Sequence, residues 1–257
     1  DVEPHKFTAS VTAERDTCVL FADGLRFDVG AVLQERLEAQ SFRVRMSHRI
    51  APIPTVTATA KPVASPAHGS CSGKADAEDF TPVITSSNQP ATASRLRDAM
   101  ARAGVEILDV DQTRMAVSGE GGGWTETGKL DALGHSLGAL LVRQIDPEVD
   151  SLLDRISALL NAGWSRVHVV TDHGWLLLPG GLPKVELSPH LVATKWSRCA
   201  AVKGGSTPSI PTYPWYWNPL LRIACPPGIG AFVANTEYAH GGISPQECVI
   251  PDLIVER

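Results

Sequence analysis

The sequence lacks the features that mark disulfide-rich, membrane-spanning and strongly basic proteins. Its five cysteines are scattered, odd in number and never spaced as CxxC, which argues against a disulfide framework and a structural zinc knuckle. No apolar run approaches the length of a membrane span, and no signal-peptide pattern occurs. The formal net charge of -5 excludes a generally basic nucleic-acid-binding surface but is compatible with a local basic groove. We therefore expect a cytoplasmic protein without a membrane partner.

Length and composition indicate one globular core. The chain has 257 residues, of which 43% are hydrophobic and 20% are charged, and both fractions are ordinary for a globular protein. It begins at Asp1 rather than Met and ends in "PDLIVER", directly after a strand-like segment. We expect residues 1–257 to form a single domain cut from a longer chain.

Strand-like and helix-like segments alternate along the chain, which predicts an α/β fold. Apolar or alternating runs typical of strands cover 17–24, 42–50, 105–110, 165–174, 220–228, 230–234 and 248–256. Helical periodicity covers 27–40, 91–104 and 146–163. This order predicts a mainly parallel central sheet sandwiched by helices.

Three stretches have a weaker pattern. Residues 52–90 are rich in Ala, Thr, Ser and Pro, and predict a helix after a turn at Thr57, followed by a surface excursion. The glycine-rich segment 116–129 is expected to be a flexible loop. The proline- and glycine-rich region 179–219 predicts hairpins that form a rim or cap over the sheet.

Metal-binding residue types gather in five short islands, each beside a predicted strand end or a glycine-rich turn. They are Asp23 in "FADGLRFD", Thr57 in "PTVTATAKP", Asp131 and His135 in "LDALGHSLG", Asp172 and His173 in "VVTDHGW", and His240 in "YAHGGIS". Three carboxylates, three imidazoles and one hydroxyl suit two divalent cations beside an activated alcohol. Taken singly, each island also suits a turn, a helix cap or a surface pair, so the prediction depends on their combination.

Position along the predicted elements supports a shared site. Open α/β sheets bind ligands outside the carboxyl ends of their strands, which is where Asp23 and the Asp172–His173 pair fall. The four-residue spacing of Asp131 and His135 places both on one face of a helix. The chain therefore predicts one two-metal site at one edge of the sheet.

A serine-hydrolase site is the competing interpretation. The segment "GHSLG" at 134–138 satisfies G-x-S-x-G, with Ser136 as the nucleophile. That motif requires a buried strand directly before it, whereas "GGGWTETGKLDAL" contains no β-branched apolar run. With Asp172 and His240 as the triad partners, this interpretation also leaves Asp23, Thr57 and His173 without a role.

The ordered motifs resemble those of the alkaline phosphatase superfamily, particularly its nucleotide pyrophosphatase/phosphodiesterase branch. The order is Asp, Thr, Asp-x3-His, Asp-His and His. More closely, "ADGLRFDV", "PTVTATAKP", "TDHGWLLLP" and "AHGGISPQECVIP" resemble the PglZ domain of bacterial BREX phage-defence systems. The resemblance extends from about residue 17 to the C-terminus, and it implies an alkaline-phosphatase-like fold with other BREX defence proteins as partners.

The resemblance also implies roles for individual residues. It implies one metal held by Asp23, Thr57, Asp172 and His173, and a second held by Asp131, His135 and His240. It implies that Thr57 attacks phosphorus to give a phosphothreonine that water then releases; Thr55 is the nearest rival. Three imidazoles and no thiolate favour Zn²⁺, and Mn²⁺ suits the same ligand types.

Substrate choice is less well determined by the sequence. Arg26 follows Asp23 closely enough to contact a phosphate oxygen, and the aromatic run "YPWYW" at 213–217 suits base stacking or packing. Lys195, Arg198 and Lys203 are expected to form a solvated hairpin face. Two function classes follow: a phosphodiesterase acting on nucleotides or DNA, and a non-catalytic or regulatory module of a multi-protein defence complex.

Overall fold

A mainly parallel sheet forms the centre of the molecule. The computed structural model describes residues 10–77, 79–113 and 121–257. Within these ranges the central sheet has the strand order β2-β15-β8-β1-β7-β6. Its strands are β1 (Thr17–Ala22), β2 (Arg43–Ile50), β6 (Glu106–Leu108), β7 (Gly123–Thr127), β8 (Arg166–Val170) and β15 (Val249–Glu256). Strand β15 runs antiparallel to both of its neighbours, whereas β6, β7, β1 and β8 pair in parallel.

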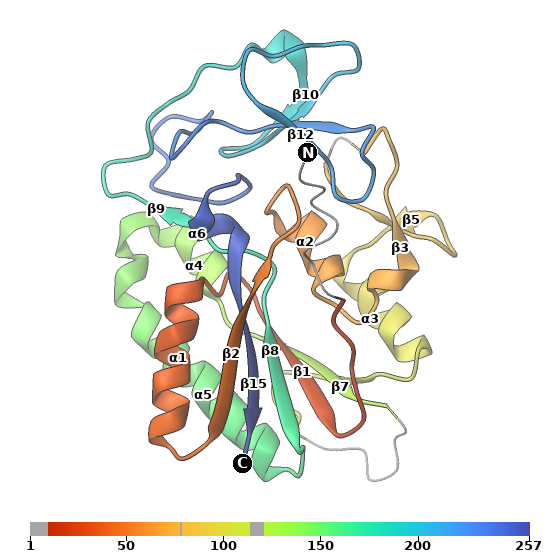
Figure 1. Ribbon diagram of the computed structural model, residues 1–257, viewed down its shortest axis with the longest axis vertical. Helices are drawn as coiled ribbons and strands as arrows, with labels where there is room; N and C mark the ends of the chain where they lie inside the picture. Colours follow the sequence, from red (N-terminus) through yellow and green to blue (C-terminus); the bar gives the residue numbers. More distant parts are fainter. Residues whose placement is uncertain (1–9, 78, 114–120) are drawn as a thin grey trace.

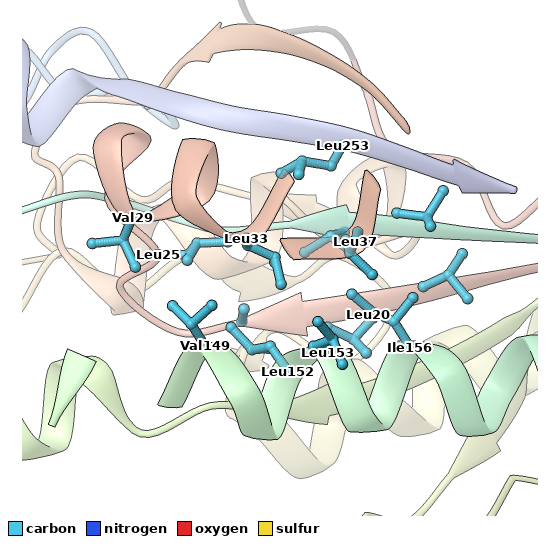
Figure 2. Packing of buried hydrophobic residues seen from close by; sticks show 14 of the residues in the cluster. Leu20, Leu25, Val29, Leu33, Leu37, Val149, Leu152, Leu153, Ile156 and Leu253 are labelled. Atoms are coloured by element: carbon cyan, nitrogen blue, oxygen red, sulfur yellow. The ribbon is translucent and has the colours of Figure 1, made fainter. Parts of the chain in front are cut away.

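Helices cover both faces of this sheet. Helices α1 (Phe27–Ala39) and α5 (Ile145–Asn161) lie on one side, and α2 (Thr57–Val63) and α3 (Ala93–Arg102) lie on the other (Figure 1). Strand β1 is buried along its whole length, because alternate side chains face the two layers. Leu20 packs with Leu152 and Ile156 of α5 (Figure 2), whereas Phe21 packs toward the α3 side. This arrangement confirms the predicted α/β sandwich.

The remaining elements lie around the sheet edges. They include the helices α4 (Leu130–Leu137) and α6 (Pro245–Cys248) and the short 3-10 helices η2 (His68–Ser70), η3 (Gly138–Arg143) and η4 (Pro189–Leu191). The excursion after α2 contains a small sheet of β3 (Cys71–Ser72), β4 (Val83–Ile84) and β5 (Gln89–Pro90). Strand β9 (Leu176–Leu177) pairs antiparallel with β14 (Tyr238–Ala239).

The region expected to form a rim contains a second sheet. Its antiparallel strands are β10 (Val192–Lys195), β11 (Ala200–Val202), β12 (Thr212–Pro214) and β13 (Arg222–Ala224), in the order β10-β11-β13-β12. It lies above the central sheet, on the side of α2 and α6 (Figure 1). The strand expected at 230–234 does not form, since Ala231 makes only an isolated bridge with Lys184.

The glycine-rich stretch 116–129 contains a central strand, so the loop prediction was wrong for its second half. Strand β7 lies between β1 and β6 in the sheet, while residues 114–120 fall outside the described ranges. A Cβ atom on Gly123 would meet the Trp164 ring at 2.7 Å. This glycine therefore permits an indole to pack against the sheet, and it does not mark a turn.

The basic run at 195–203 is not a uniformly solvated face, because Arg198 is fully buried. Its guanidinium donates to both carboxylate oxygens of Glu247, at 3.0 and 2.7 Å, and to the carbonyls of Gly228 and Gly230. Glu247 is equally buried, so removing either partner would leave an uncompensated charge at a cost of about 3–5 kcal/mol. The pair joins the second sheet to α6.

None of the helices in the described ranges combines the length and the hydropathy that crossing a bilayer requires.

Candidate metal centre

Two neighbouring parallel strands deliver the first three predicted ligands. Asp23 follows β1, and Asp172 and His173 follow β8, so the three side chains meet at the same sheet edge. A hydrogen bond connects the segments that follow the two strands: the Leu25 N–H donates to the side-chain Oγ1 of Thr171 at 3.0 Å. His173 Nε2 lies 3.5 Å from Asp172 Oδ2 and 3.9 Å from Asp23 Oδ1.

Thr57 is the first residue of α2 and enters the same cluster. Its Oγ1 lies 3.1 Å from His173 Nε2. The rival hydroxyl, on Thr55, is fully buried; it donates to Gly242 O at 2.9 Å and accepts from Gly241 N–H at 3.0 Å. Thr55 therefore holds the backbone beside His240, while Thr57 presents its hydroxyl to the cluster.

Helix α4 supplies Asp131 and His135 from successive turns, as their spacing predicts. His135 Nε2 lies 3.5 Å from Asp131 Oδ1. Tyr238 packs on the helix at Gly134, where a Cβ atom would come within 2.2 Å of the ring, and its hydroxyl donates to Asp131 Oδ1 at 2.9 Å. Sequence analysis did not single out Tyr238, although its place two residues before His240 puts both on one side of an extended chain.

His240 closes the cluster from the segment after β14. Its Nε2 lies 3.2 Å from Asp131 Oδ1 and 3.0 Å from His135 Nε2, and its ring stacks on His173 with centroids 3.8 Å apart. The Nδ1 atoms of His240 and His173 contact the carbonyls of Thr55 and Gly174, at 2.9 and 3.1 Å. An N–H at Nδ1 donates to each carbonyl, which leaves Nε2 unprotonated for a metal.

The Arg198–Glu247 pair fixes the loop that carries His240. Glu247 accepts from the backbone N–H groups of Gly242 and Ser244, at 2.8 and 3.1 Å. Thr55 binds the same loop from the other side through Gly241 and Gly242. His240 therefore sits on a segment that is hydrogen-bonded on both sides, which limits its movement without metal.

The structure brings all the predicted ligands together, but it places Arg26 elsewhere. The Arg26 guanidinium donates twice to Asp28, at 2.6 Å, and lies 3.8 Å over the Trp175 ring. It lines a cavity with Leu176 and Pro245 that includes none of the predicted metal ligands. Its local ion pair with Asp28, two residues on, outweighs its closeness in sequence to Asp23.

The acidic side chains of the cluster carry perturbed pKa values. Burial and the Asp172 carboxylate raise the pKa of Asp23 from 3.8 to about 8. Burial and Asp131 raise the pKa of Asp172 to about 6. Burial alone would raise the pKa of Asp131, but the imidazoles of His240, His173 and His135 outweigh it and hold that pKa below its ordinary value. Burial and the His173 imidazole lower the pKa of His240 to about 4.

The donor set fits divalent cations. Asp23 Oδ1 and Asp172 Oδ2 are buried and accept no hydrogen bond from the described residues. Two groups offer convergent ligand atoms, Asp23 with Asp172 and His173, and Asp131 with His173 and His240, and in each the atoms lie within 4.8 Å of one another. Buried carboxylate oxygens without a hydrogen-bond donor carry uncompensated negative charge, which a bound divalent cation would neutralise. Carboxylate and imidazole groups are also common ligands of such cations.

A cavity of about 560 Å³ opens onto this cluster. Thr57, Asp131, His135 and His240 line this cavity together with Trp196, which lies in the turn between β10 and β11. Its size is within the range of small-molecule sites. A substrate in this cavity would contact the predicted nucleophile and the second metal group together.

Ser136 does not occupy a nucleophile elbow. It lies inside α4, is exposed, and donates its hydroxyl to Leu133 O at 3.2 Å within the same helix. A nucleophile elbow places serine at a sharp turn directly between a strand and a helix. The position of Ser136 inside α4 therefore disfavours the serine-hydrolase interpretation.

Comparison with known proteins supports the fold. No protein-family model and no curated protein matches the sequence. A structure of murine ectonucleotide pyrophosphatase/phosphodiesterase 5, inactive and in complex with AMP, matches with a TM-score of 0.54 at 12% identity, over 95% of this chain and 88% of that chain. A second structure of the murine protein gives 0.54 at 13% identity, over 93% and 87% of the two chains. The human protein gives 0.52 at 12% identity, over 93% and 87%. The chain has an alkaline-phosphatase-like fold. Identity this low shows the fold alone, and the resemblance to the PglZ domain stays a prediction.

The clustered carboxylates predict how the metal-free protein responds to pH. Asp23 and Asp172 bind protons more tightly when folded, so their contribution to stability falls as pH rises from 3.8 toward about 8 and about 6, respectively. His240 acts in the opposite sense, but only between its folded pKa of about 4 and its ordinary pKa of 6.5. Of these three groups, Asp23 alone has a folded pKa above 6.5, so its ionisation should lower the free energy of unfolding of chelated protein between pH 6.5 and 8.

Urea unfolding at the two pH values, in chelator and at constant ionic strength, measures this effect. Asp23→Asn should remove the fall, and saturating Zn²⁺ should also remove it. A free energy of unfolding that is unchanged or higher at pH 8 in chelator would contradict the prediction.

Proposed function

We propose that the protein is a two-metal-dependent phosphohydrolase that cleaves phosphodiesters of nucleotides or nucleic acids, with Thr57 as the nucleophile. One observation carries this proposal: Thr57 Oγ1 lies 3.1 Å from Nε2 of His173, a residue that belongs to both groups of convergent ligands. An alcohol beside two candidate cation sites is the arrangement that phosphoryl transfer to a side chain requires.

The predicted ligands divide between two cations. Asp23, Thr57, Asp172 and His173 would hold one, and Asp131, His135 and His240 would hold the other. Bound divalent cations lower the pKa of a coordinated hydroxyl and offset charge on the transferring phosphoryl group. Zn²⁺ is the preferred metal because imidazole and carboxylate ligands occur without thiolate, and Mn²⁺ suits the same ligands.

The chain itself positions the reacting groups. The Thr57 hydroxyl loses its proton to solvent and its Oγ1 attacks phosphorus, while the bond to the leaving oxygen breaks and that oxygen departs with the electron pair. The product is a phosphothreonine, which water hydrolyses to a phosphate monoester and a free Thr57 hydroxyl. The carbonyls of Thr55 and Gly174 hold the imidazoles of His240 and His173 in the tautomer that exposes Nε2. Tyr238 donates to Asp131 Oδ1 and orients that carboxylate.

The biological setting is inferred from motif resemblance. The motifs shared with PglZ domains support a role in cytoplasmic phage defence, with other BREX proteins as partners and a nucleotide or DNA as substrate. The structural neighbours named pyrophosphatase/phosphodiesterase support diester over monoester hydrolysis. A non-catalytic role in such a complex is the outcome if no substrate is turned over.

A substrate panel with metal analysis tests the proposal. Purified protein, stripped and reloaded with Zn²⁺ or Mn²⁺, is assayed on bis(p-nitrophenyl) phosphate and on p-nitrophenyl phosphate. We expect two equivalents of metal per chain, and hydrolysis of the diester in preference to the monoester. Full loading without hydrolysis of either ester would favour the regulatory role, and failure to bind metal would overturn the proposed function.

A further inference from the structure

A second cavity, of about 290 Å³, lies against the candidate metal centre. Asp23 lines this cavity and also lies 3.9 Å from His173 Nε2, so the two features share a side chain. The other charged residues of its lining are Lys61, Arg97, Lys129 and Glu126. None of these basic residues has a role in the proposed chemistry at Thr57.

Glu126 holds two of the basic side chains, those of Lys61 and Arg97, in position. Its Oε2 accepts from Lys61 Nζ at 2.6 Å, and its Oε1 accepts from Arg97 Nε at 3.0 Å and from Trp124 Nε1 at 3.1 Å. Burial opposes ionisation of Glu126, but these bonds hold its pKa below the ordinary value. One ionised carboxylate therefore positions two basic groups.

The Lys61 and Arg97 side chains both keep hydrogen-bond donors that a ligand could use. The Lys61 ammonium has further N–H groups beyond the one that Glu126 accepts, and the Arg97 guanidinium keeps its Nη donors. The Arg97 side chain is 44% exposed, so these donors are accessible. Lys129 makes no ion pair with an acidic side chain of the described ranges.

The charge of the lining favours an anion, although the whole chain carries a formal charge of -5. Lys61, Arg97 and Lys129 face two carboxylates, Glu126 and Asp23. When Asp23 neutralises a cation of the metal centre, only Glu126 opposes three positive charges. Guanidinium and ammonium groups that converge on a small cavity are typical of phosphate recognition.

Lys61 relates this cavity to the predicted nucleophile. Lys61 and Thr57 are separated by one turn of α2, which places their side chains on the same helix face, with Cβ atoms about 5–6 Å apart. A phosphate held at Lys61 would therefore be a close neighbour of the phosphoryl group that Thr57 attacks. Adjacent phosphates of a nucleic-acid strand or of a polyphosphate are close neighbours in this way.

We propose that Lys61, Arg97 and Lys129 form a subsite for a second phosphate group of the substrate. This inference rests on the proposed function and narrows its substrate class to phosphodiesters that carry a neighbouring phosphate. The second phosphate belongs either to the next nucleotide of a strand or to a polyphosphate chain.

Two matched esters test the subsite. The p-nitrophenyl ester of thymidine 5′-phosphate has one phosphate, and the corresponding ester of thymidine 3′,5′-bisphosphate differs only by a 3′-phosphate. The Zn²⁺-loaded protein should prefer the second ester. In the double variant Arg97→Gln, Lys129→Gln, the ratio of the two kcat/KM values should fall about tenfold, the scale of a charge-assisted hydrogen bond.

The control is Arg102→Gln. It removes the positive charge of an exposed side chain on α3, the helix that carries Arg97, and Arg102 does not line the cavity. It should keep the wild-type ratio. Thymidine 5′-triphosphate separates the two sources of phosphate. If kcat/KM of the double variant falls only for the 3′-phosphorylated ester, the second phosphate belongs to a nucleic-acid strand. If kcat/KM falls only for the triphosphate, the second phosphate belongs to a polyphosphate. Equal effects of the double variant on all three substrates, the triphosphate included, would overturn the subsite.

A binding measurement separates this inference from the proposed function. If the wild-type protein hydrolyses none of these substrates, the proposed function fails. Calorimetric affinities of the Zn²⁺-loaded protein for thymidine 3′,5′-bisphosphate, thymidine 5′-triphosphate and thymidine 5′-phosphate then decide the subsite alone. We expect tighter binding of the bisphosphate, or of thymidine 5′-triphosphate, than of thymidine 5′-phosphate, and loss of that difference in the double variant; equal wild-type affinities for all three nucleotides would overturn the subsite.

Discussion

Thr57→Ala should reduce hydrolysis of bis(p-nitrophenyl) phosphate by roughly a thousandfold or more, because the covalent route requires the hydroxyl. The fold should survive, since Thr57 is a half-buried residue at the start of α2 and its hydroxyl bonds to His173 of the cluster. Steady-state kinetics at saturating Zn²⁺, with thermal melts of both proteins, measure the two effects separately.

Three control variants define the role of Thr57. Thr57→Ser keeps a hydroxyl and should retain much of the activity that Thr57→Ala loses. Ser136→Ala should be nearly silent, because Ser136 is an exposed residue of α4. Thr55→Val should lower stability, since it removes both bonds to the His240 loop. Loss of hydrolysis on changing Ser136, with Thr57→Ala unaffected, would instead support a serine hydrolase.

Asp172→Asn should have opposite effects on the metal-free and metal-loaded proteins. Asp172 is fully buried, and its Oδ2 accepts no hydrogen bond from the described residues. Its carboxylate therefore costs free energy without a cation, and the neutral amide should raise the melting temperature in chelator at pH 8. With Zn²⁺ the variant should lose the stabilisation that wild type gains, about 2.7 kcal/mol for one site at a hundred times Kd.

The same substitution should reduce diester hydrolysis by about a thousandfold or more, since a cation supplies several kcal/mol of transition-state stabilisation. Differential scanning fluorimetry with chelator and with Zn²⁺ measures the change in melting temperature that Asp172→Asn causes in each condition. The control is Asp252→Asn, which makes the same substitution at a partly buried carboxylate that pairs with His168 away from the cluster. Identical melting of wild type with and without Zn²⁺ would contradict the metal centre.

Much of the fold follows from local patterns. Strand β1 is a buried and mostly apolar run, β8 has buried valines at Val167, Val169 and Val170, and α5 has an apolar stripe with an acidic first turn. These features depend on residues close in sequence, so periodicity and helix signals predict them. The inventory of candidate ligands follows for the same reason: the strand ends and the Asp131–His135 spacing are local properties.

Long-range contacts decided the features that sequence analysis did not predict. Gly123 is typical of a loop until Trp164 packs against it, and Arg198 is typical of a solvated hairpin until Glu247 binds it. Arg26 pairs with Asp28 and does not reach the cluster. Two of these outcomes depend on a tertiary contact, and the third depends on which of two nearby carboxylates Arg26 pairs with. The periodicity of the sequence predicts neither kind of contact.

The sequence by itself determined the α/β class, the candidate ligands and their order. Tertiary structure decided how the ligands meet: His173 contacts Thr57 and stacks on His240, and the Thr55 carbonyl orients the His240 ring. It also decided that Lys61, one turn from Thr57, faces a cavity with Arg97 and Lys129. The physical reason is that a side chain's chemistry is set by its own atoms, whereas its pKa, tautomer and partners depend on groups that only folding brings near.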